Sequence, residues 1–398
     1  MSAAAPAGRS AARPEADRLL GLEGYRAVAA LLVLVYHVYQ NLRVDGRLLL
    51  EGTWAGELVQ SLTSVIDMFF VLSAFLLALP YLRRALTGER PLAAAEFLRR
   101  RAVRVVPLYY VVVLVVWVTR NGELPGHWQE LVQHLTFTQT FDDERIFHLV
   151  GPAWSLAVEV QFYVVIALLG SGVCAWCRRL VRRGARIAVA AASGAVLVLA
   201  GLGWKLGAIA LDRPEDDWST WFSLPAKLDV FGFGVLLAVV FAVRGTDPAP
   251  RAAALLTLPA AALLLAGVQL GTREGTVTEL RHTLIGAGFA FVLAATVLAG
   301  PRSALVRALQ WRPLLLLALL SYSLYLWHEP LMLWMSDLPF WPQTSSPGAI
   351  AFGVALLLPV ALVVAAVSCF LVEQPAATLR HTRTADGRPR LYYGEGAG

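Results

Sequence analysis

Apolar residues gather in ten runs along the chain, separated by short polar segments. The runs cover approximately 24–42, 62–82, 102–119, 154–176, 187–211, 224–243, 252–271, 281–299, 313–336 and 348–372. Each run holds about twenty residues, which is the length an α-helix needs to cross the hydrocarbon core of a bilayer. The pattern therefore predicts an all-α, polytopic membrane helix bundle with about ten transmembrane helices.

The composition agrees with a multi-pass protein of the cell (plasma) membrane. Hydrophobic residues make up 57% of the 398 residues and only 16% are charged, whereas about a quarter of a soluble domain is charged. We expect residues 1–20 to form a disordered cytoplasmic tail, 21–376 the membrane domain, and 377–398 a cytoplasmic C-terminal tail.

Basic residues alternate between the loops. All but two of the 34 basic residues are Arg, and they concentrate before the first run and in every second connection after it, at 83–104, 178–186, 244–251, 302–312 and 380–390. By the positive-inside rule, both termini are then cytoplasmic. Clusters separated by apolar runs do not form the continuous basic face that a nucleic acid requires, so we expect no nucleic-acid partner. Cys174 and Cys177 lack a second pair or a nearby His, so we expect no metal site.

Ionisable residues inside membrane spans are costly and tend to mark function. The first run contains Arg26 near its start and His37 eleven residues later. Eleven residues make three turns of helix and a rise of about 16 Å. Arg26 and His37 should therefore share one helix face, with Arg26 near the cytoplasmic rim and His37 in the outer half of the membrane.

Polar residues of three other runs are expected at the depth of His37. The fourth run enters from outside with Trp154 and then Ser155, Glu159 and Tyr163 on one face, at spacings of four residues. The second run begins close to Asp67, and the ninth run leaves outward with Tyr325 and His328. Two histidines and two carboxylates from four runs should thus lie at a similar depth in the outer half.

A basic cluster is expected at the inner rim. Arg101 and Arg104, three residues apart, open the third run and could join Arg26. Guanidinium groups bind phosphate oxygens in pairs, so such a cluster suits a phosphate-bearing ligand. Simpler roles stay open for these residues: topology signals for the arginines, packing for a single His, and interfacial anchoring for Tyr and Trp.

Several of these segments resemble signatures of the acyltransferase-3 family of integral membrane acyltransferases. They follow the family's order: LEGYRAVAALLVLVYH, IDMFFVLSAFLL, FLRRRAVRVVPLYY, WSLAVEVQFY, AKLDVFGFGVLLA, SYSLYLWHEP and VEQP. The resemblance implies a ten-helix enzyme that moves an acyl group from acyl-CoA to a hydroxyl, usually on a sugar. It also implies that His37 is catalytic and assigns Arg26, Arg101 and Arg104 to the matching family motifs. Ala27 and Ala74 stand where the family usually has Gly.

The residues and the resemblance together suggest a mechanism. The three arginines would hold the phosphates of the donor, acetyl-CoA or a longer acyl-CoA, and His37 would act as general base on the acceptor hydroxyl. Glu159 or Asp67 would orient the His37 ring. The substrate-binding group would contain Trp154, Ser155, Tyr163, Tyr325 and His328. An acyl-His intermediate is a second route.

The same pattern allows alternative functions. The acceptor could be a cell-surface carbohydrate or the sugar of a secreted antibiotic. A transporter of a polar or glycan substrate would also bury His and carboxylates within ten spans, although the inverted repeats common in transporters are not visible here. Release of CoA from acyl-CoA separates an enzyme from a transporter.

Overall fold

A computed structural model describes residues 19, 21–43, 46–120, 127–344 and 346–378. The expected tail 1–20 lies outside these residues except for 19, and so does the expected C-terminal tail beyond 378. The long helices are α1 (Leu22–Asn41), α3 (Val65–Thr87), α4 (Ala94–Arg120), α6 (Ala153–Cys177), α7 (Arg183–Ala210), α9 (Leu224–Arg244), α10 (Pro250–Gly271), α11 (Arg281–Ala299), α13 (Arg312–Ser336) and α14 (Pro347–Ser368).

The short elements connect or extend these helices. They are α2 (Trp54–Gln60), η2 (Ser61–Ser64), α5 (Trp128–Leu135), η3 (Gln139–Phe141), α8 (Trp218–Trp221), η4 (Thr276–Leu280), α12 (Ala304–Leu309), the π-helical η5 (Cys369–Glu373) and α15 (Gln374–Thr378). Ten helices of the described part are long and apolar enough to cross a membrane. The predicted all-α bundle of about ten spans is therefore confirmed.

The third span begins earlier than its apolar run. Apolar residues predict a helix over 102–119, but α4 begins at Ala94. The added turns carry Glu96, whose carboxylate pairs with Arg99 at 2.9 Å and with Arg100 at 3.5 Å. Pairs three and four residues apart stabilise a polar helical segment. Arg99, Arg100, Arg101 and Arg104 therefore lie on the same continuous helix as the third apolar run.

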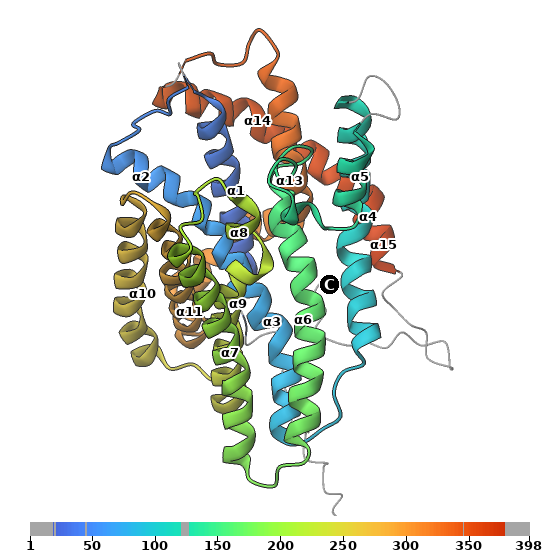
Figure 1. The fold of residues 1–398 in the computed structure, drawn as a ribbon, viewed down its shortest axis with the longest axis vertical. Coiled ribbons are helices and arrows are strands. Elements are labelled where there is room, and N and C mark those ends of the chain that lie inside the picture. The colour runs from blue at the N-terminus through green and yellow to red at the C-terminus, as the bar shows by residue number, and fades with distance from the viewer. Residues whose placement is uncertain (1–18, 20, 44–45, 121–126, 345, 379–398) are drawn as a thin grey trace, which may run out of the picture.

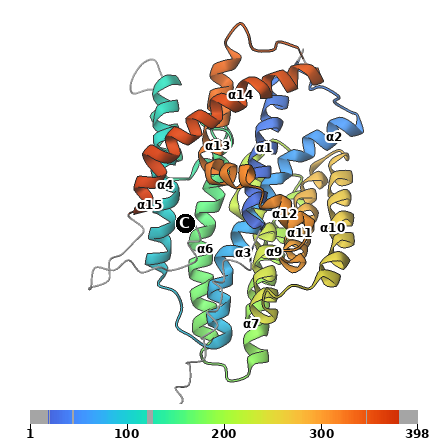
Figure 2. The ribbon, with the colours of Figure 1, turned by 180° about the vertical axis from the view of Figure 1, so that it is seen from behind.

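The centre of the bundle consists of α3 and α9, which are the most buried spans, whereas α10 and α14 are the least buried. Figures 1 and 2 show α10 and α11 on one flank, α4 and α5 on the other, and α3, α6 and α9 between them. The closest helix pairs are α3 with α9, α7 with α9, α10 with α11, and α1 with α13. The last pair brings the first and ninth spans side by side.

Small residues allow the central helices to approach closely. A Cβ on Gly234 of α9 would collide with the carbonyl oxygen of Val71 on α3 and would lie 2.6 Å from the Cβ of Ala74. A Cβ on Gly170 of α6 would lie 2.6 Å from the Tyr81 ring. Helices in lipid associate largely through such close packing, because apolar side chains gain little by leaving lipid for protein.

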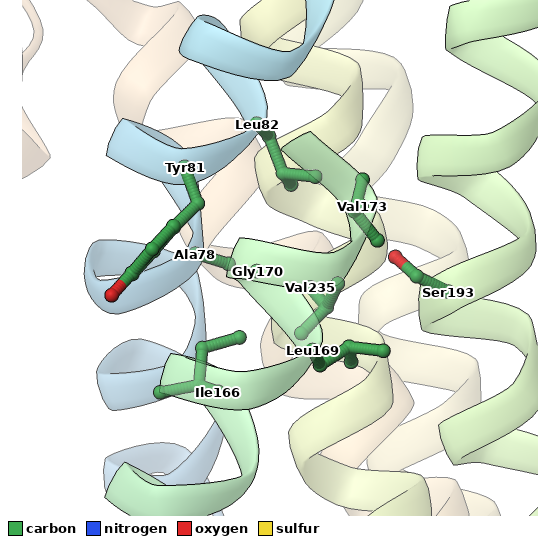
Figure 3. A pocket seen from close by; sticks show the side chains of 9 residues that line it. All are labelled: Ala78, Tyr81, Leu82, Ile166, Leu169, Gly170, Val173, Ser193 and Val235. Atoms are coloured by element: carbon green, nitrogen blue, oxygen red, sulfur yellow. The ribbon is translucent and has the colours of Figure 1, made fainter. Parts of the chain in front are cut away.

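A small apolar pocket lies where α3, α6, α7 and α9 meet. Its lining is almost wholly apolar, and the Ser193 hydroxyl points toward Val173, whereas the Tyr81 hydroxyl points away from them (Figure 3). None of the site residues expected from the sequence lines it. The pocket therefore belongs to the packing of the bundle, and the chemistry has to be sought elsewhere.

Substituting Gly234 tests the central packing. Gly234→Val should lower the free energy of unfolding by about 1–3 kcal/mol, the usual cost of forcing extra methyl groups into a packed interface. The melting temperature of the detergent-solubilised protein should fall accordingly. Gly203→Val is the matched control, because a Cβ on Gly203 would meet nothing within 4 Å. Equal melting temperatures for the two variants would contradict the packing described here.

Candidate active site

His37 and His328 face each other across the α1–α13 contact. The Nδ1 of His37 lies 3.1 Å from the Nε2 of His328, and the ring centroids are 4.9 Å apart. His328 is fully buried, whereas the His37 side chain keeps partial exposure. The structure thus brings together two of the residues that the sequence placed at one depth.

Backbone carbonyls define the tautomers of both rings. The Nδ1 of His328 lies 2.7 Å from the carbonyl oxygen of Tyr325, and the Nδ1 of His37 lies 2.9 Å from that of Val33. A carbonyl only accepts, so in the neutral rings both Nδ1 atoms carry the proton. The Nε2 of His328 then accepts from the Nδ1 of His37. The Nε2 of His37 is left with its lone pair and has no hydrogen-bond partner among the described residues.

Two hydroxyls extend the histidine pair toward α6. The Tyr325 hydroxyl lies 2.7 Å from the Ser155 hydroxyl and 2.7 Å from the carbonyl oxygen of Pro152. The Tyr325 and His328 rings lie 5.7 Å apart, with the residues one helical turn from each other. Ser155, Tyr325, His328 and His37 therefore form one continuous row from α6 to α1.

The two predicted carboxylates contact other groups. Glu159 accepts a hydrogen bond of 2.6 Å from Ser73, and Asp67 lies 2.7 Å from the Nδ1 of His282 on α11. Within the described residues, neither carboxylate contacts His37. The contacts that hold the His37 ring come instead from the Val33 carbonyl and from His328.

Arg26 lies among charged and phenolic groups of α4 and α6. Its guanidinium interacts electrostatically with Arg104, Glu159 and Tyr163. Tyr163 in turn interacts with Arg101 as well as Arg104. Arg26 also interacts with Glu23, so three arginines face two carboxylates and the group keeps a net positive charge, which suits an anionic ligand. The Nε of Arg26 is buried and has no hydrogen-bond partner in the described part of the chain.

Trp154 lies apart from the histidine pair. Its ring packs edge-to-face on Phe70 and on Phe222, with centroids 6.1 Å and 4.6 Å away. The ammonium of Lys227 lies 5.7 Å from the Trp154 centroid. Trp154 therefore belongs to a neighbouring group of buried charges, although the adjacent Ser155 contacts Tyr325.

Sequence reasoning missed several charged residues that organise this region. Glu329 accepts a hydrogen bond of 2.7 Å from the backbone N–H of Gly151, which ties α13 to the start of α6. His282 partners Asp67, and Lys227 and Asp229 are completely buried on α9. The signal was present, because each is an ionisable residue within or beside an apolar run, the criterion that identified His37.

Known proteins resemble this chain along most of its length. Residues 19–372 match the model of the acyltransferase-3 family, described as an acyltransferase domain. O-acetyltransferase OatA of Staphylococcus aureus is 24% identical over 343 residues, which cover 80% of this chain and 51% of OatA. The putative peptidoglycan O-acetyltransferase YrhL of Bacillus subtilis is 26% identical over 382 residues, covering 90% of this chain and 55% of YrhL.

A third relative matches over most of both chains. The putative membrane-bound transacylase BcsY of Komagataeibacter xylinus is 24% identical over 374 residues, or 90% of this chain and 83% of BcsY. The chain spans about half the length of OatA and YrhL. No solved structure matches significantly. With ten candidate spans and a family match that runs from residue 19 to residue 372, this chain belongs to the acyltransferase-3 family of membrane proteins.

Proposed function

We propose that this protein is a membrane O-acyltransferase that moves an acyl group from cytosolic acyl-CoA to a hydroxyl of a carbohydrate, with the Nε2 of His37 as general base. The proposal rests on the hydrogen bonds of the His37 ring. Its Nδ1 is engaged by the Val33 carbonyl and by His328, and its Nε2 has no partner in the described residues. A neutral imidazole held in this way presents a lone pair in the interior of the bundle.

The relatives support the class of reaction. OatA and YrhL are named as O-acetyltransferases, and the name of YrhL specifies peptidoglycan. An acetyl group on a carbohydrate hydroxyl is the product expected from a His base acting on a thioester donor. A glycan of the cell envelope is therefore our first candidate for the acceptor, and acetyl-CoA for the donor.

The donor would enter from the cytoplasmic side. The guanidinium groups of Arg26, Arg101 and Arg104 would bind the phosphates of CoA, with their charge only partly offset by Glu159 and Glu23. His37 lies about 16 Å along the same helix from Arg26, which is comparable to the extended pantetheine arm. The thioester carbonyl would then lie beside the His37 ring.

The transfer step balances without any further reagent. The His37 Nε2 takes the proton of the acceptor hydroxyl as its oxygen attacks the thioester carbonyl carbon. The tetrahedral intermediate then breaks its C–S bond, and the departing CoA sulfur receives the proton from the imidazolium. Ser155 and Tyr325 supply hydroxyl dipoles close to the His37–His328 pair as charge develops. His328 keeps the His37 proton on Nδ1 throughout.

Removal of the base tests the reaction class. His37→Ala should lower CoA release from acetyl-CoA by a factor of about 10²–10⁴, the usual contribution of general acid–base catalysis. The assay uses the purified protein in nanodiscs with a thiol reagent that reports CoA. His148→Ala is the control, because His148 is exposed in a loop. Retained turnover in His37→Ala would remove His37 from the mechanism, and uptake of a polar solute without CoA release would indicate transport.

A positioning role for His328 predicts selective rescue. His328→Leu removes one of the two acceptors of the His37 Nδ1 proton and leaves the Val33 carbonyl. It should lower kcat about tenfold to a hundredfold and leave the KM for acetyl-CoA nearly unchanged. His328→Gln keeps an acceptor oxygen and should recover part of kcat. If kcat and the melting temperature fell equally in both variants, His328 would be a packing residue and not a positioning residue.

A phosphate-binding role for Arg26 predicts a defect in donor binding. Arg26→Gln should raise the KM for acetyl-CoA about tenfold to a hundredfold, the effect of losing one charge-assisted hydrogen bond. Arg179→Gln, at an exposed position after α6, is the control. Adenosine 3′,5′-bisphosphate should inhibit the wild type and the control more strongly than Arg26→Gln. An unchanged KM in Arg26→Gln would place the CoA phosphates elsewhere.

A further inference from the structure

A second group of buried charges lies among α3, α7, α9 and α11, apart from the histidine pair. Lys205 on α7 donates to Asp229 at 2.8 Å and to Thr283 at 3.0 Å, and Thr283 also donates to Asp229. Lys227 on α9 interacts electrostatically with Asp67 and with Glu279. The mechanism proposed above uses neither lysine.

The two buried lysines of this group differ in how their ammonium groups are satisfied. The Lys205 ammonium has a carboxylate and a hydroxyl as partners. The Lys227 side chain is completely buried, yet its Nζ has no hydrogen-bond partner among the described residues. It lies instead near the rings of Phe222 and Trp154, 5.1 Å and 5.7 Å from their centroids. A buried ammonium forms hydrogen bonds to protein or ligand atoms in most structures.

Other buried polar atoms near Lys227 share this lack of partners. They are the Oγ of Ser64, the Oδ1 of Asp67, the Oγ of Ser223 and the Oδ1 of Asp229. Ser223 is the N-cap residue of α9, four residues before Lys227, and Ser64 ends η2 three residues before Asp67. The packed helices α3 and α9 therefore place donors and acceptors together at one end of the bundle.

The chemistry of this set favours a neutral hydroxylated ligand. The two lysines and Arg281 balance Asp67, Asp229 and Glu279, so the group offers no excess charge to an ion. Within the described part of the chain, these carboxylates also do not form a cluster that could hold a metal ion. Hydroxyl groups both donate and accept, so a polyol satisfies ammonium, hydroxyl and carboxylate partners at once.

The aromatic neighbours fit a sugar ring. Trp154 and Phe222 are half-buried, and Phe222 continues into edge-to-face contacts with Phe147 and Trp218. Flat rings beside a few convergent polar groups are typical of small-molecule sites. The group also adjoins the histidine pair, since Ser155 follows Trp154 and contacts Tyr325, and Phe69 lies 6.4 Å from the Tyr325 ring.

We infer that Lys227, Asp67 and Ser223, with the rings of Trp154 and Phe222, form the subsite for the carbohydrate acceptor. This inference rests on the proposed O-acyltransferase function and names the residues that select its acceptor. On binding, the Lys227 Nζ and the Asp67 Oδ1 gain hydrogen bonds to hydroxyls of the sugar. Trp154 directly precedes Ser155, which contacts Tyr325, so the bound sugar lies next to the group that contains His328 and His37.

The test compares the two buried lysines in the full-length protein in nanodiscs. Saturation-transfer difference NMR, without donor, follows three neutral probes: a chitooligosaccharide, a cello-oligosaccharide and a galacto-oligosaccharide. At least one probe should bind the wild type. Lys227→Met should weaken that binding at least tenfold, whereas Lys205→Met should lower the melting temperature with less than a twofold change in binding.

A second variant and a kinetic measurement complete the test. Phe222→Leu, at a half-buried ring, should also weaken the probe about tenfold if Lys227→Met fails to fold. With the bound probe as acceptor, the acceptor KM should rise in Lys227→Met while the acetyl-CoA KM stays within twofold. Two outcomes would overturn the subsite and leave the proposed function standing. In one, the wild type releases CoA in a His37-dependent way but binds no probe; in the other, the variants bind the probe as strongly as the wild type. Absence of CoA release would instead count against the function.

Discussion

The hydrocarbon core of a bilayer offers no water, so a polar side chain inside this bundle is satisfied only by the backbone of its own helix or by a group on another helix. That constraint accounts for the arrangement of the spans. The His37–His328 contact joins α1 to α13, the Glu159–Ser73 bond joins α6 to α3, and the Lys205–Asp229 pair joins α7 to α9. Close packing through glycine brings the helices near enough for these short bonds to form.

The same constraint separates satisfied groups from unsatisfied ones. The Lys205 ammonium and one oxygen of Asp229 pair with each other, and Thr283 adds a hydrogen bond to each of them. The His37 Nε2, the Arg26 Nε and the Lys227 Nζ have no such partner in the described residues. Unsatisfied polar atoms in a membrane interior are costly, which is why these three atoms enter the proposals above as ligand contacts.

Much of this architecture could be predicted from the sequence. Apolar runs of bilayer length gave the number of spans, and helix periodicity placed Arg26 and His37 on one face of α1. The same periodicity placed Tyr325 and His328 on one face of the ninth run and Ser155 at a similar depth on the fourth, and the structure joins Ser155 to Tyr325 by a contact. The N-terminal extension of α4 was missed, because its stability comes from the Glu96–Arg99 pair and not from apolar residues.

Partners across the bundle could not be predicted in the same way. Periodicity gives the depth and face of a residue on its own helix but not the rotation of the neighbouring helix, so Asp67 could be placed at the depth of His37 without revealing that it faces His282. Lys227 could be noticed in the sequence as a charge at the start of an apolar run. That its Nζ has no hydrogen-bond partner among the described residues could be learned only from the packing of α9 against its neighbours.

Arg26 and His37 lie on a single helix, so the geometry of α1 fixes the distance between them. Relative movements of other helices leave the separation of these two groups unchanged, so in the proposed mechanism a coenzyme bound at Arg26 would present its thioester at a constant height. Adding or removing one residue between them would turn the imidazole by about 100° and shift it by about 1.5 Å. If the proposed mechanism holds, the number of residues between Arg26 and His37 restricts the chemistry as much as their identity does, and acyl chains of different length would extend beyond the His37 ring.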